Sequence, residues 1–197
     1  MYIFVDEEFT GLHKDTTLIS IGLVDGKGRT FYAEFLDYDT TQVNSWIQNN
    51  VIEKLKFQKP ENGEEPYYNI QYEADTELYS IEMQGTKESI KEELLKWLSH
   101  YDECIFVMDV GAYDFILLVD LLFGCAINIP SNISAAYHEL NNDIAIYKGT
   151  TVASAFDFSR EDLYKELVEA EPHYNDKHNC LYDAKIIKGI FDGIHNR

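Results

Sequence analysis

The chain has little cysteine, few basic residues and no long apolar run. Its three cysteines, Cys104, Cys125 and Cys180, are scattered and lack paired ligand spacing, which argues against a disulfide framework or zinc site and favours reduced thiols in the core. The longest apolar stretch, residues 115–123, is interrupted by Asp120, and no basic segment precedes an apolar one at the N-terminus. We therefore expect no membrane span and no secretory signal, and a cytoplasmic location.

Basic residues are scarce beside acidic ones: 16 Lys and Arg stand against 35 Asp and Glu, for a formal charge of −19. Phosphate contacts by basic side chains supply most of the affinity of a nucleic-acid binder, so this balance argues against tight binding along long polymers. The same balance argues less against an enzyme that acts at the ends of chains, because metal ions there can neutralise carboxylates and receive phosphates. Most of the acids are expected to form a solvated surface.

A length of 197 residues with 45% hydrophobic residues suits one domain, residues 1–197, with a single core. Within it, residues 56–79 are polar and rich in tyrosine, and we interpret them as a long loop or small insertion. The remaining patterns predict strands over 2–5, 17–24, 29–35 and 103–108, a loop or short strand over 127–134, and helices over 41–51, 86–100, 112–123, 135–147, 159–168 and 179–194.

The first three strands form an antiparallel meander, with a hairpin turn at residues 25–28 between the second and third. The apolar run at 103–108 is typical of a central parallel strand. This order of elements predicts a mixed sheet with helices on its faces, in an α/β or α+β fold.

The first motif is Asp6-Glu7-Glu8-Phe9-Thr10-Gly11, at the end of the first strand. Asp6 and Glu8 are two residues apart and therefore share one face of the strand. Two converging carboxylates repel each other unless a cation lies between them, and such oxygen ligands suit Mg²⁺ or Mn²⁺. The alternative is an exposed acidic turn.

The second motif, Asp109 to Asp114, follows the apolar strand and ends in Tyr113-Asp114. It holds two candidate ligands: we favour Asp114 as the metal carboxylate and give Asp109 a supporting role. The alternative for Asp114 is stabilisation of a helix N-terminus.

The third motif is His178-Asn179-Cys180-Leu181-Tyr182-Asp183-Ala184. A spacing of five puts His178 and Asp183 off a common helix face, so His178 should precede the helix, with Asn179 at its cap. A histidine on a loop beside a metal ligand can accept a proton from an attacking water. The alternative is a surface histidine before a helix. Arg160 and Lys177 are candidate phosphate contacts.

Taken together, the three motifs in this order and spacing resemble those of the DEDDh 3′–5′ exonucleases. The form Asp-x-Glu-Phe-Thr-Gly resembles a subgroup of small bacterial and phage exoribonucleases. The sequence departs from the family at Phe9, where many members have threonine, and at Asp109, where asparagine is usual. The resemblance implies a ribonuclease H-like fold, with a mixed five-stranded sheet of meander and parallel strands flanked by helices.

The resemblance also implies a function. Two Mg²⁺ or Mn²⁺ ions would be held by the carboxylates of four residues, and His178 would be the general base. Phe9, Thr10 and Gly11 would contact the terminal nucleotide of a single-stranded 3′ end, of RNA in preference to DNA. No membrane partner is expected, and a homodimer is compatible with this interpretation. The four ligands would be Asp6, Glu8, Asp114 and Asp183.

Two alternatives remain open. The same machinery acts on DNA in the proofreading subunits of DNA polymerases, and sugar preference depends on a pocket for the 2′-hydroxyl. A non-enzymatic acidic protein that mimics nucleic acid would explain the charge. It would not explain carboxylates at all four motif positions together with the histidine.

Overall fold

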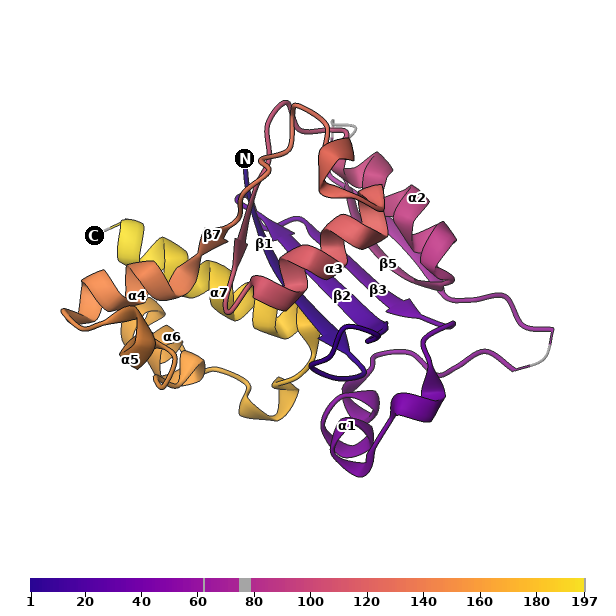
Figure 1. Ribbon diagram of the computed structural model, residues 1–197, viewed down its shortest axis with the longest axis horizontal. Helices are drawn as coiled ribbons and strands as arrows, with labels where there is room; N and C mark the ends of the chain where they lie inside the picture. The colour runs from indigo at the N-terminus through magenta and orange to yellow at the C-terminus, as the bar shows by residue number, and fades with distance from the viewer. Residues whose placement is uncertain (62, 75–78, 197) are drawn as a thin grey trace.

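The centre of the fold is a sheet built from the β-branched and aromatic segments of the chain. The computed structural model describes residues 1–61, 63–74 and 79–196. Over these residues the sheet has seven strands in the order β4-β5-β3-β2-β1-β6-β7 (Figure 1). The strands are β1 (Tyr2–Phe9), β2 (Leu18–Asp25), β3 (Thr30–Phe35), β4 (Tyr68–Tyr72), β5 (Tyr79–Gly85), β6 (Ile105–Met108) and β7 (His138–Glu139).

The sheet is mixed. Strands β1, β2 and β3 form the predicted antiparallel meander, and β4 pairs antiparallel with β5. The β3–β5, β1–β6 and β6–β7 pairs are parallel. An α/β fold with a mixed sheet is therefore confirmed.

The helices begin where side chains can cap them. Thr86, Ser159 and Asn179 each accept a hydrogen bond from the backbone N–H three residues further on, as expected of N-caps. The helices are α1 (Ser45–Asn50), α2 (Lys87–Leu98), α3 (Ala112–Phe123), α4 (Leu140–Lys148), α5 (Val152–Ala155), α6 (Arg160–Val168) and α7 (Cys180–His195), with 3₁₀ turns at Thr40–Gln42, Ile52–Lys54, Ala126–Asn128 and Tyr174–Asp176.

Alternating side chains of the strands divide the core into two layers. Ile3 and Val5 of β1 pack in the cluster that includes residues of α2 and α3. Phe4, which points to the opposite face, packs with residues of α4, α6 and α7. Figure 1 shows this arrangement, with α2 and α3 on one side of the sheet and α7 on the other. The even-numbered residues of β1 therefore face α7.

The prediction of five strands was wrong, because the sheet has seven. Strands β4 and β7 lie at its two ends, and β5 was not among the predicted strands. Strand β4 lies within residues 56–79, which we had interpreted as loop or insertion. It is an edge strand, and Tyr68 and Tyr72 are 51% and 68% exposed, so it lacks the apolar alternation of a buried strand. Strand β7 has only two residues, too few to leave a sequence pattern.

Several boundaries also differ from prediction. Strand β1 runs to Phe9, so its carboxylates lie within the strand and not at its end. The helix predicted over 135–147 begins at Leu140, after β7, and the short α5 was not predicted. Cys104 and Cys180 are buried as expected, whereas Cys125 is exposed, because Gly124 ends α3 at the surface.

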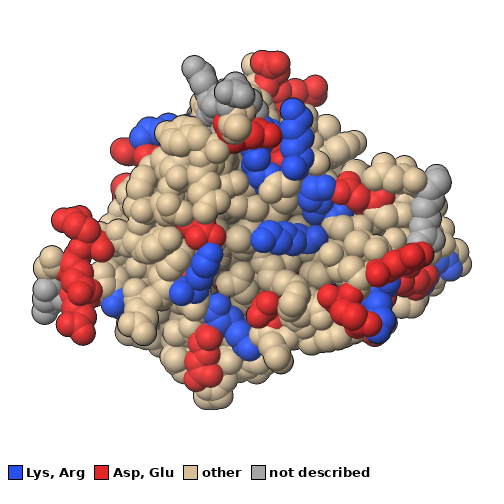
Figure 2. All heavy atoms as spheres, turned by 180° about the vertical axis from the view of Figure 1, so that it is seen from behind, with Lys and Arg blue, Asp and Glu red and all other residues tan. Residues whose placement is uncertain are grey.

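The charge of the chain is not spread as a continuous acidic layer. Figure 2 shows one face on which Lys and Arg side chains lie between Asp and Glu side chains and wide uncharged areas. Over the residues that the structure describes, no helix has both the length and the apolar character needed to cross a membrane.

Candidate active site

The carboxylates of the first motif lie on the face of β1 that is covered by α7. Asp6 and Glu8 alternate with Glu7, which points to the opposite face and is 4% exposed. Asp6 and Glu8 line a pocket of about 230 Å³, together with His178 and Asp183. Two strand residues and two residues at the start of α7 are thereby brought together.

A glycine allows α7 to come this close to the sheet. Gly22 of β2 is paired with Asp6 of β1. A Cβ at Gly22 would lie 2.5 Å from the carbonyl carbon of Cys180 and from the amide nitrogen of Leu181. Any side chain there would displace the first turn of α7, and Asp183 with it.

His178 precedes α7 and Asn179 caps it, as the spacing predicted. The backbone of His178 is in the left-handed region, with a φ of 66°. Its N–H donates to Asp183 Oδ2 at 2.9 Å. The imidazole Nδ1 lies 3.6 Å from Glu8 Oε1. The loop histidine is thus held between the helix-borne and the strand-borne carboxylate.

Asp114 approaches these carboxylates from the other layer; it does not line the pocket itself but is near enough to raise the pKa of Asp6. Strand β6 ends at Met108, so the last residues of β1 extend beyond their parallel partner. There the N–H of Glu7 donates to Asp114 Oδ1 at 3.1 Å, in place of a strand neighbour. Asp114 is 8% exposed and lies in the first turn of α3.

The four carboxylates are close enough to disturb one another. Burial, followed by repulsion from Asp183, Glu8 and Asp114, holds the pKa of Asp6 well above its ordinary value. Burial also raises the pKa of Glu8, although the bond from His178 opposes this. Burial and neighbouring carboxylates, Glu8 among them, raise the pKa of Asp114 and that of Asp183 to about 7.

Across the described part of the chain, no Lys or Arg side chain forms an ion pair with any of these four carboxylates. The ion-pair partner of Glu8 is His178, and this contact raises the pKa of His178. Buried acids without a cationic partner are unfavourable as anions, so this site is suited to an added cation.

Asp109 lines the same pocket but differs from the four, because it has a cationic partner. Arg160 Nε donates to Asp109 Oδ2 at 2.5 Å, and Nη2 donates to Oδ1 at 2.8 Å. The fully buried Asn141 adds a bond to Oδ1 at 2.8 Å. Arg160, a predicted phosphate contact, is thus engaged by Asp109. Lys177, the other, lines the pocket 3.5 Å from Glu161 Oε1.

The residues after Glu8 have different environments. Phe9 is half-buried and stacks on Tyr113, with ring centroids 5.8 Å apart. Thr10 is 2% exposed; its hydroxyl donates to Gln42 Oε1 and accepts from the N–H of Thr17. Gly11 is partly exposed in the following loop. The hydroxyl of Thr10 is therefore engaged inside the protein, and contact of this segment with substrate stays a prediction.

Sequence reasoning missed Trp46. Its ring lies 5.2 Å from that of His178, edge to face, and it is 54% exposed on α1. The helix around it was predicted, but an exposed tryptophan cannot be distinguished from a core one by pattern. Its exposure beside the site is the feature that singles it out.

Comparison with known proteins finds a short sequence match to exoribonucleases and a similar fold in a solved structure. No protein-family model matches the chain. It is 38% identical over 55 residues to a 3′-5′ exoribonuclease of Mycobacterium tuberculosis, from strain CDC 1551 / Oshkosh and from strain H37Rv. The match spans 28% of this chain and 33% of each relative.

The fold is similar to that of Pop2p from S. pombe, solved in a Mg²⁺- and Mn²⁺-bound form. The TM-score is 0.53 and the identity 14%, and the alignment covers 100% of this chain and 83% of Pop2p. This likeness supports the ribonuclease H-like fold that the motifs implied.

Proposed function

We propose that this protein is a metal-dependent 3′–5′ exoribonuclease that removes nucleotides from single-stranded 3′ ends. One observation carries the proposal: three distant motifs bring four carboxylates and a histidine to one site, and in the described part of the chain no Lys or Arg neutralises those carboxylates. The short match to mycobacterial 3′-5′ exoribonucleases supports the reaction class.

Asp6, Glu8, Asp114 and Asp183 would hold the metal. The donor set fits two Mg²⁺ or Mn²⁺ ions, which prefer carboxylate oxygens and relieve the repulsion that raises the pKa values of these acids. When bound, such ions activate a water and stabilise the leaving 3′ oxygen.

His178 would take the proton of the attacking water. Its position rests on its own N–H bond to Asp183 and on the contact of Nδ1 with Glu8. Asp183 is itself a proposed ligand, so one hydrogen bond joins the base to a ligand at the start of α7. An imidazole accepts a proton only when it is neutral, and activity should therefore rise as His178 loses its proton.

The substrate would be a flexible chain end. Trp46 and Phe9, with its stacked Tyr113, present aromatic surface on which unpaired bases can stack. The net charge of −19 disfavours extended contact with a duplex. Arg160 would act through Asp109, keeping that turn in place between β6 and α3.

Hydrolysis of 5′-labelled single-stranded RNA and DNA, with Mn²⁺ or with chelator, tests the proposal. We expect an RNA ladder that shortens from the 3′ end and disappears with chelator. Equal or faster hydrolysis of DNA would favour a DNA exonuclease at the same site. Cleavage of circular RNA, or activity unaffected by chelator, would contradict the proposed reaction.

A further inference from the structure

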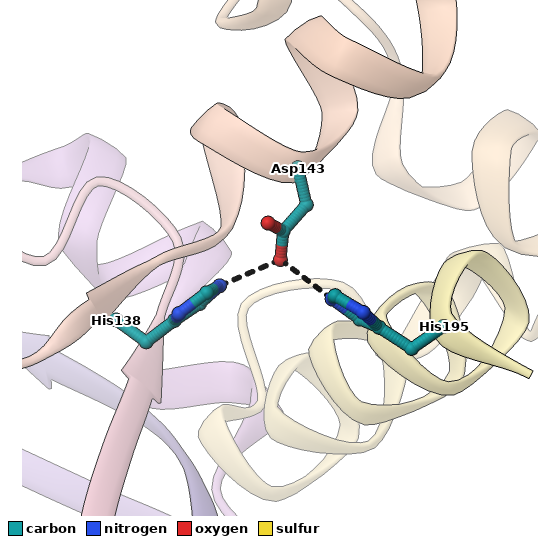
Figure 3. A group of neighbouring side chains, drawn as sticks. All are labelled: His138, Asp143 and His195. Carbon is teal, nitrogen blue, oxygen red and sulfur yellow. Dashed lines mark hydrogen bonds and ion pairs between the residues drawn. The ribbon is translucent and has the colours of Figure 1, made fainter.

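A second cluster of metal-ligand side chains lies away from the candidate active site. It consists of His138 on β7, Asp143 on α4 and His195 in the last turn of α7 (Figure 3). Both histidines point their Nε2 atoms at one carboxylate oxygen. The distances to Asp143 Oδ2 are 2.6 Å from His138 and 3.1 Å from His195. The proposed function uses none of these residues.

Asp143 is the unusual member of this cluster. It is 8% exposed, and both of its ion-pair partners within the described residues are histidines, with no Lys or Arg among them. The side chain of Asp143 is only 10% exposed, so a cation bound between the three side chains would balance its charge where no Lys or Arg of the described residues does.

We propose that His138, Asp143 and His195 bind a divalent transition-metal ion of the Zn²⁺ class. Two imidazoles and a carboxylate form a donor set that zinc uses, and oxygen-preferring Mg²⁺ does not. The three ligand atoms lie within 4.8 Å of one another. Tetrahedral bonds of about 2.1 Å separate ligand atoms by roughly 3.4 Å, so the two ring nitrogens, 2.6 Å and 3.1 Å from Asp143 Oδ2, need to move away from that oxygen by less than about 1 Å.

The surroundings of the two rings allow that movement and keep both rings oriented toward the same point. The side chains of His138 and His195 are 30% and 45% exposed, which leaves a side open for a water as fourth ligand. Both rings pack on Phe191, with centroids 5.5 Å and 4.2 Å away. The ion would join the end of α7 to the short edge strand β7 and to α4.

The two sites are separate. Asp183 and His195 are twelve residues apart on α7, which corresponds to about 18 Å along the helix axis. Zn²⁺ binding can still be confused between them, because Glu8, His178 and Asp183 also form a histidine-containing cluster. The experiment therefore starts from the full chain carrying His178→Ala and Asp183→Asn.

Equilibrium dialysis against Zn²⁺, with excess Mg²⁺ present, gives the stoichiometry. This background variant should retain one Zn²⁺. Adding His195→Gln should weaken binding at least tenfold, since loss of an outer-shell group alone costs 10–100-fold. Adding His100→Ala, an exposed histidine that follows α2, should change nothing. If the background variant binds no Zn²⁺, or if His195→Gln binds it as tightly, the site is wrong.

Thermal melting gives a second measure that does not depend on stoichiometry. Zn²⁺ should raise the melting temperature of the background variant and not that of its His138→Ala or His195→Gln derivatives. His195→Gln is the safer of the two, because His195 is the more exposed side chain and lies in the last turn of α7. An equal Zn²⁺ shift in the background variant and in the His195→Gln derivative would overturn the proposal.

Discussion

Two regions of this molecule bury carboxylates in opposite ways. At the β2–β3 turn, Asp25 is fully buried and is paired with Arg29, whose Nε donates to Oδ2 at 2.6 Å. Tyr101 and two backbone N–H groups complete its hydrogen bonds. In the candidate active site, the described residues include no Lys or Arg paired with Asp6, Glu8, Asp114 or Asp183.

The difference separates a carboxylate whose charge is balanced by a basic side chain from acids that have no such partner among the described residues. The charge of Asp25 is balanced by Arg29. The four active-site acids are the ones for which we propose a metal. Asp109 lines the same pocket and does have a basic partner, because Arg160 forms an ion pair with it. Three substitutions and one change of pH test this contrast.

The largest expected effect is on catalysis. His178→Ala should lower turnover by roughly 10²–10⁴-fold, the range for loss of a general base, while the melting temperature stays near that of the native protein. His173→Ala, an exposed histidine just before the same helix, is the matched control. Undiminished hydrolysis by His178→Ala would remove this residue from the mechanism.

The next effect is on stability and concerns the β2–β3 turn, where Asp25 is paired with Arg29. Arg29→Met leaves Asp25 buried without its partner and should lower the free energy of unfolding by about 3–5 kcal/mol, as measured in urea. Lys27→Met removes the same charge from an exposed position in the same turn and should cost little. A small loss in Arg29→Met would mean that the pair at the turn does not stabilise the fold.

Asp6→Asn tests the acids of the candidate active site, which have no Lys or Arg partner among the described residues. It removes a ligand and a source of repulsion together, so the metal-free variant should melt higher than the native protein. Mn²⁺ at a hundredfold excess over its dissociation constant should stabilise the native fold by about 2.7 kcal/mol, and should stabilise the variant less. Asp102→Asn and sodium chloride at matched ionic strength control for general charge relief. An unchanged response of Asp6→Asn to Mn²⁺ would contradict the metal site.

The last effect is that of pH on the metal-free protein. The pKa values of Asp114 and Asp183 are about 7 in the folded state and about 4 in the unfolded chain. The folded state therefore binds more protons in this window, and its stability should fall as the pH rises from about 4 to 7. Melting curves between pH 5 and 8 should show this fall without metal and a smaller one with Mn²⁺. An equal fall of stability with pH, with and without Mn²⁺, would argue that Asp114 and Asp183 do not lack a counter-charge in the metal-free protein.

Local signals predicted much of the fold. The turn at residues 25–28 and the caps Thr86, Ser159 and Asn179 leave patterns within a few residues, and the structure contains each of them. Strand β4 was missed because its pairing with β5 depends on residues that do not show a buried alternation. Edge strands obtain their order from a neighbour, which a local pattern cannot reveal.

The features of the candidate site likewise divide into those that local spacing predicts and those that only the tertiary fold reveals. Spacing alone predicted that His178 precedes a helix and that Asp183 lies within it. It did not predict that Gly22, far away in the chain, lies against the start of that helix. Nor did it predict that Arg160 pairs with Asp109 or that Trp46 lies beside His178. Such contacts join residues from separate elements and follow only from the tertiary fold.

Helix α7 carries a member of each histidine-containing cluster, Asp183 in its first turn and His195 in its last. The helix therefore joins the proposed metal site to the proposed Zn²⁺ site. Cations bound at both ends would obey reciprocity: any factor by which one changes the affinity of the other would apply equally in the opposite direction.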